Sequence, residues 1–77
     1  MLRAFITGGS GFVGRNLIAY CRARAVEVRA LARSETAAQA VEKIGAQPVI
    51  GDLNDNEILR EAMAGCDVVF HLIISYK

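Results

Sequence analysis

The sequence is poor in the residues that hold metals or cross-links. Its 77 residues include no Trp, one Pro, one His and two Cys. Cys21 and Cys66 lie far apart, without Cys-x-x-Cys spacing and without a cluster of histidines. This pattern indicates neither a zinc site nor a disulfide framework. We expect no metal site, and we expect both cysteines to be buried thiols, because a free Cys packs as a small hydrophobe.

The chain also lacks an excess of charge and a long apolar run. Its formal net charge is only +1, which gives no field that would attract nucleic acid or an anionic membrane. Its longest apolar stretch, residues 68–74, is interrupted by His71 and is too short to cross a bilayer. The opening run at residues 2–7 is too short for a signal core. We expect a cytoplasmic protein with no nucleic-acid partner and no membrane partner.

What the sequence does contain is typical of a globular chain. Hydrophobic residues make up 53% and charged residues 22%, as in soluble folded proteins rather than disordered ones. At this length the chain can form one domain at most. We therefore predict a single domain over residues 1–77.

Hydrophobic periodicity predicts strands that alternate with helices. The turn glycines and the Ser34 N-cap separate these elements, and Gly45 and Gly65 stand where helix-ending glycines belong. The third helix has Asn54 or Asp55 as its cap. The predicted strands are residues 2–7, 26–32, 47–50 and 68–74, and the predicted helices begin near residues 12, 35 and 56.

This alternation predicts an α/β fold. Strands joined by helices through short turns favour a parallel sheet with helices on both faces, a three-layer sandwich. In the doubly wound, Rossmann-type arrangement the strand order is 3-2-1-4. The fourth strand is nearly continuous in apolar residues, which predicts that it is covered on both faces. The order reverses between the first and fourth strands, directly above the first glycine turn.

The glycines at that turn carry the strongest functional signal. Gly9, Gly11 and Gly14 match G-x-G-x-x-G, between a predicted strand and a predicted helix. Gly11 would let the backbone approach a pyrophosphate, and Gly14 would let the helix pack close to the sheet. The amides and the dipole of the first helical turn would bind the phosphates. Arg15-Asn16 excludes a P-loop, which needs Lys and then Ser or Thr there. The alternative is a glycine-rich turn without a ligand.

Thr7 to Gly14 also resembles the T-G-x-x-G-F-x-G signature of extended short-chain dehydrogenase/reductases, the NAD-dependent epimerase/dehydratase group. Residues 30–34, 51–53 and 67–72 resemble this family's second strand, its adenine-contacting G-D-L/I and its fourth strand. The resemblance implies that Asp52 accepts from the adenine amino group and that Leu53 packs on the adenine ring. The alternative for Asp52 is a loop residue that caps the third helix. The cofactor-binding set implied in full is Gly8, Gly9, Ser10, Gly11, Phe12, Val13, Gly14, Arg33, Asp52, Leu53 and Leu72.

Arg33 bears on which dinucleotide binds. NAD-specific members of the family usually place Asp or Glu at the end of the second strand, where this chain has Ala32-Arg33. A guanidinium can form a bidentate pair with a 2′-phosphate. We therefore expect NADP in preference to NAD. The alternative is that Arg33 is an ordinary solvated surface charge.

Four residues depart from the family pattern or invite another role. Ala25 stands in a turn where the family commonly has Gly with a positive φ. An Ala that keeps this backbone conformation would lower the stability of the fold by about 1 kcal/mol. Ile73-Ile74 replaces two alanines beside the nicotinamide ribose. His71 lies in an apolar strand, where a hydrogen-bonded structural histidine is more common than a catalytic one.

The catalytic residues of the resembled family have no counterpart here. The family uses Tyr-x-x-x-Lys, in which the lysine lowers the tyrosine pKa, and this sequence contains no such motif. Ser75-Tyr76-Lys77 has the right residue types at the wrong spacing, and Tyr20 with Arg24 lacks the lysine. We expect residues 1–77 to be half of a dinucleotide-binding Rossmann domain, with no catalytic residue and no substrate domain, and we interpret the last residues as the end of a shortened or frame-altered reading.

Two functional hypotheses follow. The first is the dinucleotide-binding, amino-terminal part of an oxidoreductase, epimerase or dehydratase. The second is a non-catalytic module that senses the dinucleotide or associates with itself. A sheet that ends at the fourth strand exposes an apolar edge, so we expect a homo-oligomer formed partly by residues 68–74.

Overall fold

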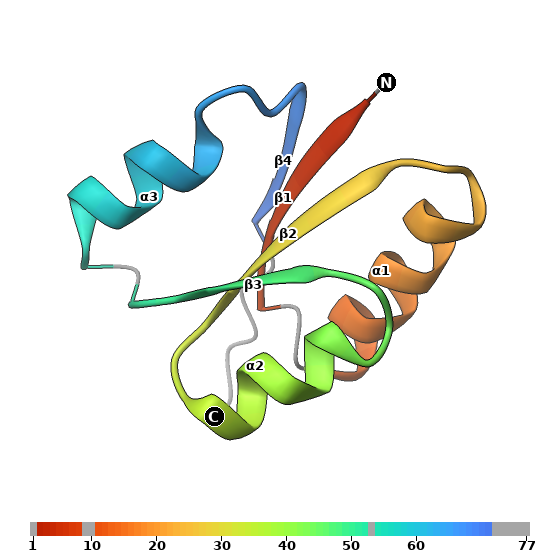
Figure 1. Ribbon diagram of the computed structural model, residues 1–77, viewed down its shortest axis with the longest axis horizontal. Helices are drawn as coiled ribbons and strands as arrows, with labels where there is room; N and C mark the ends of the chain where they lie inside the picture. The colour runs from red at the N-terminus through yellow and green to blue at the C-terminus, as the bar shows by residue number, and fades with distance from the viewer. Residues whose placement is uncertain (1, 9–10, 53, 72–77) are drawn as a thin grey trace, which may run out of the picture.

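The computed structural model describes residues 2–8, 11–52 and 54–71. Strands and helices alternate as predicted (Figure 1). The predicted fourth strand continued to residue 74, and its last three residues lie outside the described part. The elements in chain order are β1 (Arg3–Thr7), α1 (Phe12–Ala23), β2 (Glu27–Ala32), α2 (Glu35–Glu42), β3 (Gln47–Ile50), α3 (Asn56–Met63) and β4 (Val68–His71).

The four strands form one parallel sheet. Their order is β3-β2-β1-β4, which confirms the predicted 3-2-1-4 arrangement. In β1, Ala4 pairs with Val28 on one side and with Val68 on the other. The sheet lies between two layers of helix, with α1 and α2 on one face and α3 on the other (Figure 1). The fold is therefore an α/β sandwich of the Rossmann type.

Two hydrophobic clusters fix these layers. Ile6 of β1 packs in the cluster that contains Ile18 of α1 and Val41 of α2. Phe5, the preceding residue, packs in the cluster that contains Ala62 of α3. Successive strand residues point to opposite faces, and both side chains are fully buried. β1 is therefore an interior strand of the sheet, covered on both faces.

The ends of the helices follow the predicted chemistry in most places. The Ser34 hydroxyl accepts a hydrogen bond from the Ala37 amide at 3.1 Å, so Ser34 caps α2 as expected. Gly45 and Gly65 have φ of +103° and +79°, in the left-handed region that favours glycine. Asp55 is the N-cap residue of α3, but its side chain makes no cap hydrogen bond there.

Three expectations about burial were wrong. The helical spacing of Val13, Leu17 and Ile18 predicts a buried stripe along the first helix, yet Val13, in the first turn of α1 directly after the glycine turn, is 56% exposed. The fourth strand was expected to be covered on both faces, yet Val68 and Val69 are exposed. Within the described residues β4 pairs with β1 alone. Cys21 is buried as predicted, whereas Cys66 is only half-buried.

Ala25 has the positive φ that the family resemblance implied. Its φ is +60°, which costs a residue with a Cβ about 1 to 2 kcal/mol. We expect Ala25→Gly to raise the free energy of unfolding by about 1 kcal/mol, the relief of strain being partly offset by the greater entropy of the unfolded chain. Urea denaturation measures this difference. Ala19→Gly within α1 is the control and should instead lower stability by about 1 kcal/mol. An equal loss in both variants would contradict a strained turn at Ala25.

Candidate functional site

The predicted site residues that the structure describes lie at one end of the strands. All four strands are parallel, so their carboxyl ends lie together on this side of the sheet. β1 ends in the glycine turn, β2 is followed by Arg33, β3 by Gly51-Asp52, and β4 ends at His71. β1 and β4 are neighbours, but the chain leaves β1 towards the helix layer that contains α1. In open α/β sheets this reversal of strand order creates the crevice in which ligands bind.

The glycine turn brings the backbone sharply from the sheet into α1. Gly8 has φ of +73°, and the Gly11 amide donates a hydrogen bond to the Gly8 carbonyl at 3.3 Å. Gly14 is buried within α1, in keeping with its expected role in close helix packing. Gly9 and Ser10, which were also predicted to bind the cofactor, lie outside the described residues. The strand-turn-helix context that the motif requires is present.

The amino-terminal end of α1 suits an anion. Gly11 is its N-cap residue, with φ −78° and ψ 172°, and no side chain caps this helix or adds an acidic group in its first turn. The first-turn amides of a helix lack intrahelical acceptors and lie at the positive end of its dipole. By contrast, α2 has the Ser34 cap and Glu35 in its first turn. Of these two helix ends, that of α1 is the better site for a phosphate.

Phe12 and Val13 flank this position on the outer surface of α1. Phe12 is 75% exposed, which is unusual for so large an apolar side chain. Both residues follow the N-cap directly, so they lie beside the predicted diphosphate position. Their exposure is consistent with the cofactor-binding role that the family resemblance implies for both residues.

The residues predicted for the adenosine end lie after β2 and β3. Ala32 and Ile50 are register partners at the ends of these strands, and the Gly51 amide donates to the Ala32 carbonyl at 2.9 Å. Arg33 and Asp52 are both exposed. Leu53 lies outside the described residues. The backbone thus brings Arg33 and Asp52 to adjacent strand ends.

Asp52 has a structural role in its own loop. Its Oδ1 accepts from the Asn54 amide at 2.9 Å, and its amide donates to Oδ2 of Asp55 at 2.9 Å. Gly51 is tightly packed, because a Cβ added there would lie 3.1 Å from Cγ2 of Ile58. Asp52 therefore shapes the loop before α3, while Asp55 occupies the N-cap position itself.

His71 is hydrogen-bonded, as the sequence interpretation expected. Its Nδ1 lies 2.7 Å from the Thr7 hydroxyl oxygen, and the two residues are register partners in β1 and β4. The sequence interpretation named no partner for this histidine. Leu72, Ile73 and Ile74 lie outside the described residues.

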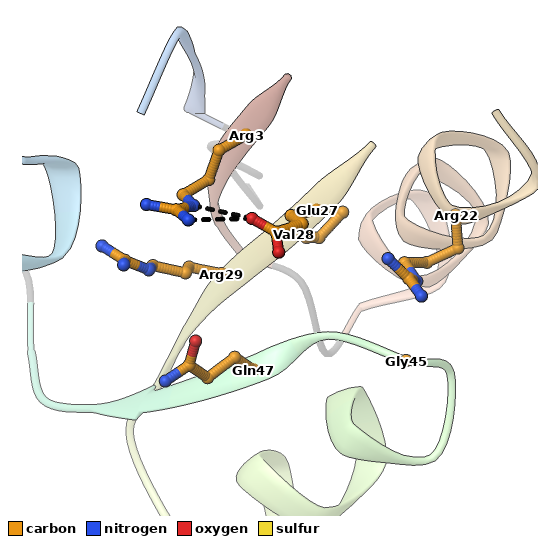
Figure 2. A pocket seen from close by; sticks show the side chains of 7 residues that line it. All are labelled: Arg3, Arg22, Glu27, Val28, Arg29, Gly45 and Gln47. Atoms are coloured by element: carbon orange, nitrogen blue, oxygen red, sulfur yellow. Dashed lines mark hydrogen bonds and ion pairs between the residues drawn. The ribbon is translucent and has the colours of Figure 1, made fainter. Parts of the chain in front are cut away.

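A separate polar pocket lies at the opposite side of the sheet, beside the amino-terminal ends of the strands. Its volume is about 190 Å³, and the Arg3–Glu27 ion pair, at 2.9 Å, crosses it (Figure 2). Arg29 extends from β2 and donates from Nη1 to the carbonyl of Ala62 at 3.0 Å, near the end of α3. These interactions connect the beginning of β1 to the beginning of β2, and they connect β2 to the end of α3. The lining residues are Arg3, Arg22, Glu27, Val28, Arg29, Gly45 and Gln47.

Within the part of the chain that the structure describes, no group of three or more His, Cys, Asp or Glu side chains could hold a metal ion. Over the same residues, no helix has both the length and the apolar character needed to cross a membrane.

Comparison with known proteins agrees with this geometry. A family of NAD(P)H-binding domains matches residues 8–75, a range that includes the glycine turn, Arg33 and Asp52. This chain belongs to that NAD(P)H-binding Rossmann family. The family resemblance drawn from the sequence, to the extended short-chain dehydrogenase/reductases, is confirmed.

Individual relatives show the same relationship. A 4-hydroxy-2-methyl-3-oxo-4-farnesyl-3,4-dihydroquinoline-1-oxide ketoreductase from Stigmatella aurantiaca is 59% identical over 70 residues, covering 91% of this chain and 21% of that protein. A short-chain dehydrogenase/reductase superfamily protein from Agrobacterium tumefaciens, solved with bound NAD, is 28% identical with a TM-score of 0.74, covering 97% of this chain and 22% of the other. The structure of AtPrR2 with NADP⁺ and (+)pinoresinol is 27% identical with a TM-score of 0.81, and the match covers 96% of this chain and 26% of the other.

The chain spans about a fifth of the length of the curated relatives that it matches. It therefore corresponds to their NAD(P)-binding, amino-terminal part. One similar structure holds NAD and another holds NADP⁺, so both nicotinamide dinucleotides occur among these similar structures.

Proposed function

We propose that this chain binds NADP in preference to NAD, as the dinucleotide-binding part of a reductase that acts on a ketone. The observation that carries the binding proposal is the uncapped amino-terminal end of α1, directly after the glycine turn. The diphosphate would accept hydrogen bonds from the amides of this turn. The ketone is inferred from the ketoreductase that is 59% identical to this chain.

The preference for NADP rests on Arg33. This residue is exposed after the carboxyl end of β2, where a ribose 2′-substituent lies in a Rossmann domain. A guanidinium there would pair with a 2′-phosphate, whereas an acidic residue would repel it. Asp52, at the neighbouring strand end, would accept from the adenine amino group.

The chain itself would bind the dinucleotide without completing catalysis. It contains no Tyr-x-x-x-Lys motif, and the group that holds or moves a proton in this family would have to come from elsewhere. When bound, the nicotinamide supplies the hydride. The residues of this chain would hold the diphosphate and the adenosine end and so position the nicotinamide ring.

Calorimetric titration of the chain with NADPH and with NADH tests this function. We expect saturable binding of both, with NADPH about tenfold tighter, since a charge-assisted contact contributes about 1.5 kcal/mol. Binding without turnover of added ketones would agree with the proposal. No binding of either dinucleotide would contradict it and favour the second function below.

A second candidate function is self-association, which the exposed side chains of β4 favour. Val68 and Val69 are 42% and 46% exposed, and within the described residues β4 has no strand on its outer side. An apolar edge strand of this kind can pair with another copy. We propose a homo-oligomer in which the β4 edges meet.

Sedimentation velocity tests this interface. We expect the chain to associate as its concentration rises, and Val69→Lys to weaken the association at least about tenfold, because it places a charge in the apolar contact. Ala19→Lys, on the exposed surface of α1, is the control with the same added charge. A strictly monomeric profile at high concentration would contradict the interface.

A further inference from the structure

Thr7 and His71 join the ends of the two strands beside the crevice. Oγ1 of Thr7 lies 2.7 Å from Nδ1 of His71, although the residues are 64 positions apart in the sequence. Thr7 is only 4% exposed, whereas His71 is exposed. The contact therefore connects a buried hydroxyl at the end of β1, next to the glycine turn, to an exposed imidazole at the end of β4.

The position of this contact links it to the glycine turn. β1 ends at Thr7, and the next residue, Gly8, already has φ of +73°. A side-chain bond at Thr7 adds to the backbone ladder at its last register pair, Thr7 with His71. It fixes the point at which the chain leaves the sheet, and that point sets where the amides of the following turn lie.

The chemistry of the pair makes the contact robust. A hydroxyl both donates and accepts, so Thr7 can bond to Nδ1 whether or not that nitrogen carries a proton. The contact also distinguishes between amide replacements of the histidine. Asn carries its amide atoms on Cγ, the carbon to which Nδ1 of His is attached, so Asn can occupy the place of Nδ1. Gln is one carbon longer and places its amide elsewhere.

We propose that Thr7 and His71 are positioning residues for the dinucleotide. Their hydrogen bond holds the end of β1 against β4, and this keeps the glycine turn in the geometry that receives the diphosphate. The inference rests on the proposed dinucleotide binding. It assigns His71 a role in affinity through Thr7, without contact between the imidazole and the reacting atoms.

Four single variants of the 77-residue chain test this role. Thr7→Val and His71→Gln remove the bond, while Thr7→Ser and His71→Asn are matched replacements that keep it. Each is titrated with NADP⁺ by calorimetry and with 2′-AMP by NMR chemical shift. The second ligand has the 2′-phosphate and the adenosine but no diphosphate. Circular dichroism at the titration temperature measures the folded fraction of each variant.

We expect Thr7→Val and His71→Gln to bind NADP⁺ about tenfold more weakly, because a tenfold loss of affinity is the scale of one hydrogen bond. The matched replacements should stay within about twofold of the parent. Affinity for 2′-AMP should not change in any variant. If Thr7→Val fails to fold, the comparison of His71→Gln with His71→Asn at the exposed position still decides the question.

Three results would overturn the proposal. The first is undiminished NADP⁺ affinity in the bond-removing variants that fold. The second is an equal loss in His71→Asn and His71→Gln, which would assign the effect to the imidazole itself. The third is a parallel loss of NADP⁺ and 2′-AMP binding, which would indicate general loosening of the domain. A parent chain that binds no dinucleotide refutes the proposed function before any variant is compared.

Discussion

Replacing Gly11 with aspartate should abolish measurable dinucleotide binding while leaving the fold intact. The backbone of Gly11, at φ −78° and ψ 172°, suits any L residue, and Asp is among the best N-cap residues. Its carboxylate would accept the first-turn amides of α1, the same donors that we assign to the diphosphate. We expect affinity for NADPH to fall at least about a hundredfold, or about 2.8 kcal/mol.

Stability should move in the opposite direction. Exchanging Gly for Asp at an N-cap contributes a few tenths of a kcal/mol to helix stability, so Gly11→Asp should unfold at the same urea concentration as the parent or a slightly higher one. Ala19→Asp places the same charge on the exposed face of the same helix and should bind NADPH nearly as well as the parent. If Gly11→Asp retained NADPH affinity, the phosphates would not lie at this helix end.

The second large effect is expected at Arg33. We expect Arg33→Asp to lower affinity for NADPH about thirtyfold, since it removes a charge-assisted contact of about 1.5 kcal/mol and adds repulsion between the carboxylate and the phosphate. Affinity for NADH should rise, because Asp can accept from the ribose hydroxyls. Competitive titration of both dinucleotides against one fluorescent nucleotide measures the ratio of the two affinities.

The matched control for Arg33→Asp is Lys43→Asp. It makes the same change in net charge at an exposed position beyond α2, away from the carboxyl edge of the sheet. A general electrostatic effect on an anionic ligand would lower NADPH affinity equally in both variants. An unchanged ratio of NADPH to NADH affinity in Arg33→Asp would mean that Arg33 is a solvated surface charge.

The elements and their order could be predicted because local chemistry specifies them. Ser34 caps a helix through an acceptor that lies three residues from its donor, and Gly45 ends one through a positive φ that it alone adopts cheaply. The strand order followed from the rule for parallel, doubly wound sheets. Each of these inferences needs only neighbouring residues or a rule of topology.

What could not be predicted depends on where an element ends relative to its neighbours. The helical spacing of Val13 is correct for a buried stripe, but its burial depends on how far the sheet extends beneath the first turn of α1. The apolar run of β4 is typical of a covered strand, yet Val68 and Val69 are exposed. Periodicity reports which side chains share a face, but it does not report whether anything covers that face.

The candidate site shows the same division. The glycine turn was predictable because glycines at this spacing indicate where the backbone, free of Cβ atoms, must approach a ligand. The contact of Thr7 with His71 required the register of two strands that are distant in the sequence. Likewise, the close approach of Ile58 to Gly51 explains why a glycine precedes Asp52, and no spacing rule predicts it.

The position of β1 between β2 and β4 has a consequence for the order of folding. Its partner on one side, β2, follows after a single helix, whereas its partner on the other side, β4, is the last described strand. Contacts between distant segments form late because closing a long loop costs entropy. During synthesis the segment that begins with β1 and ends with β2 can assemble first, whereas the crevice gains its second wall only when β4 has emerged. Competence to bind a dinucleotide is therefore acquired only after β4 has docked beside β1.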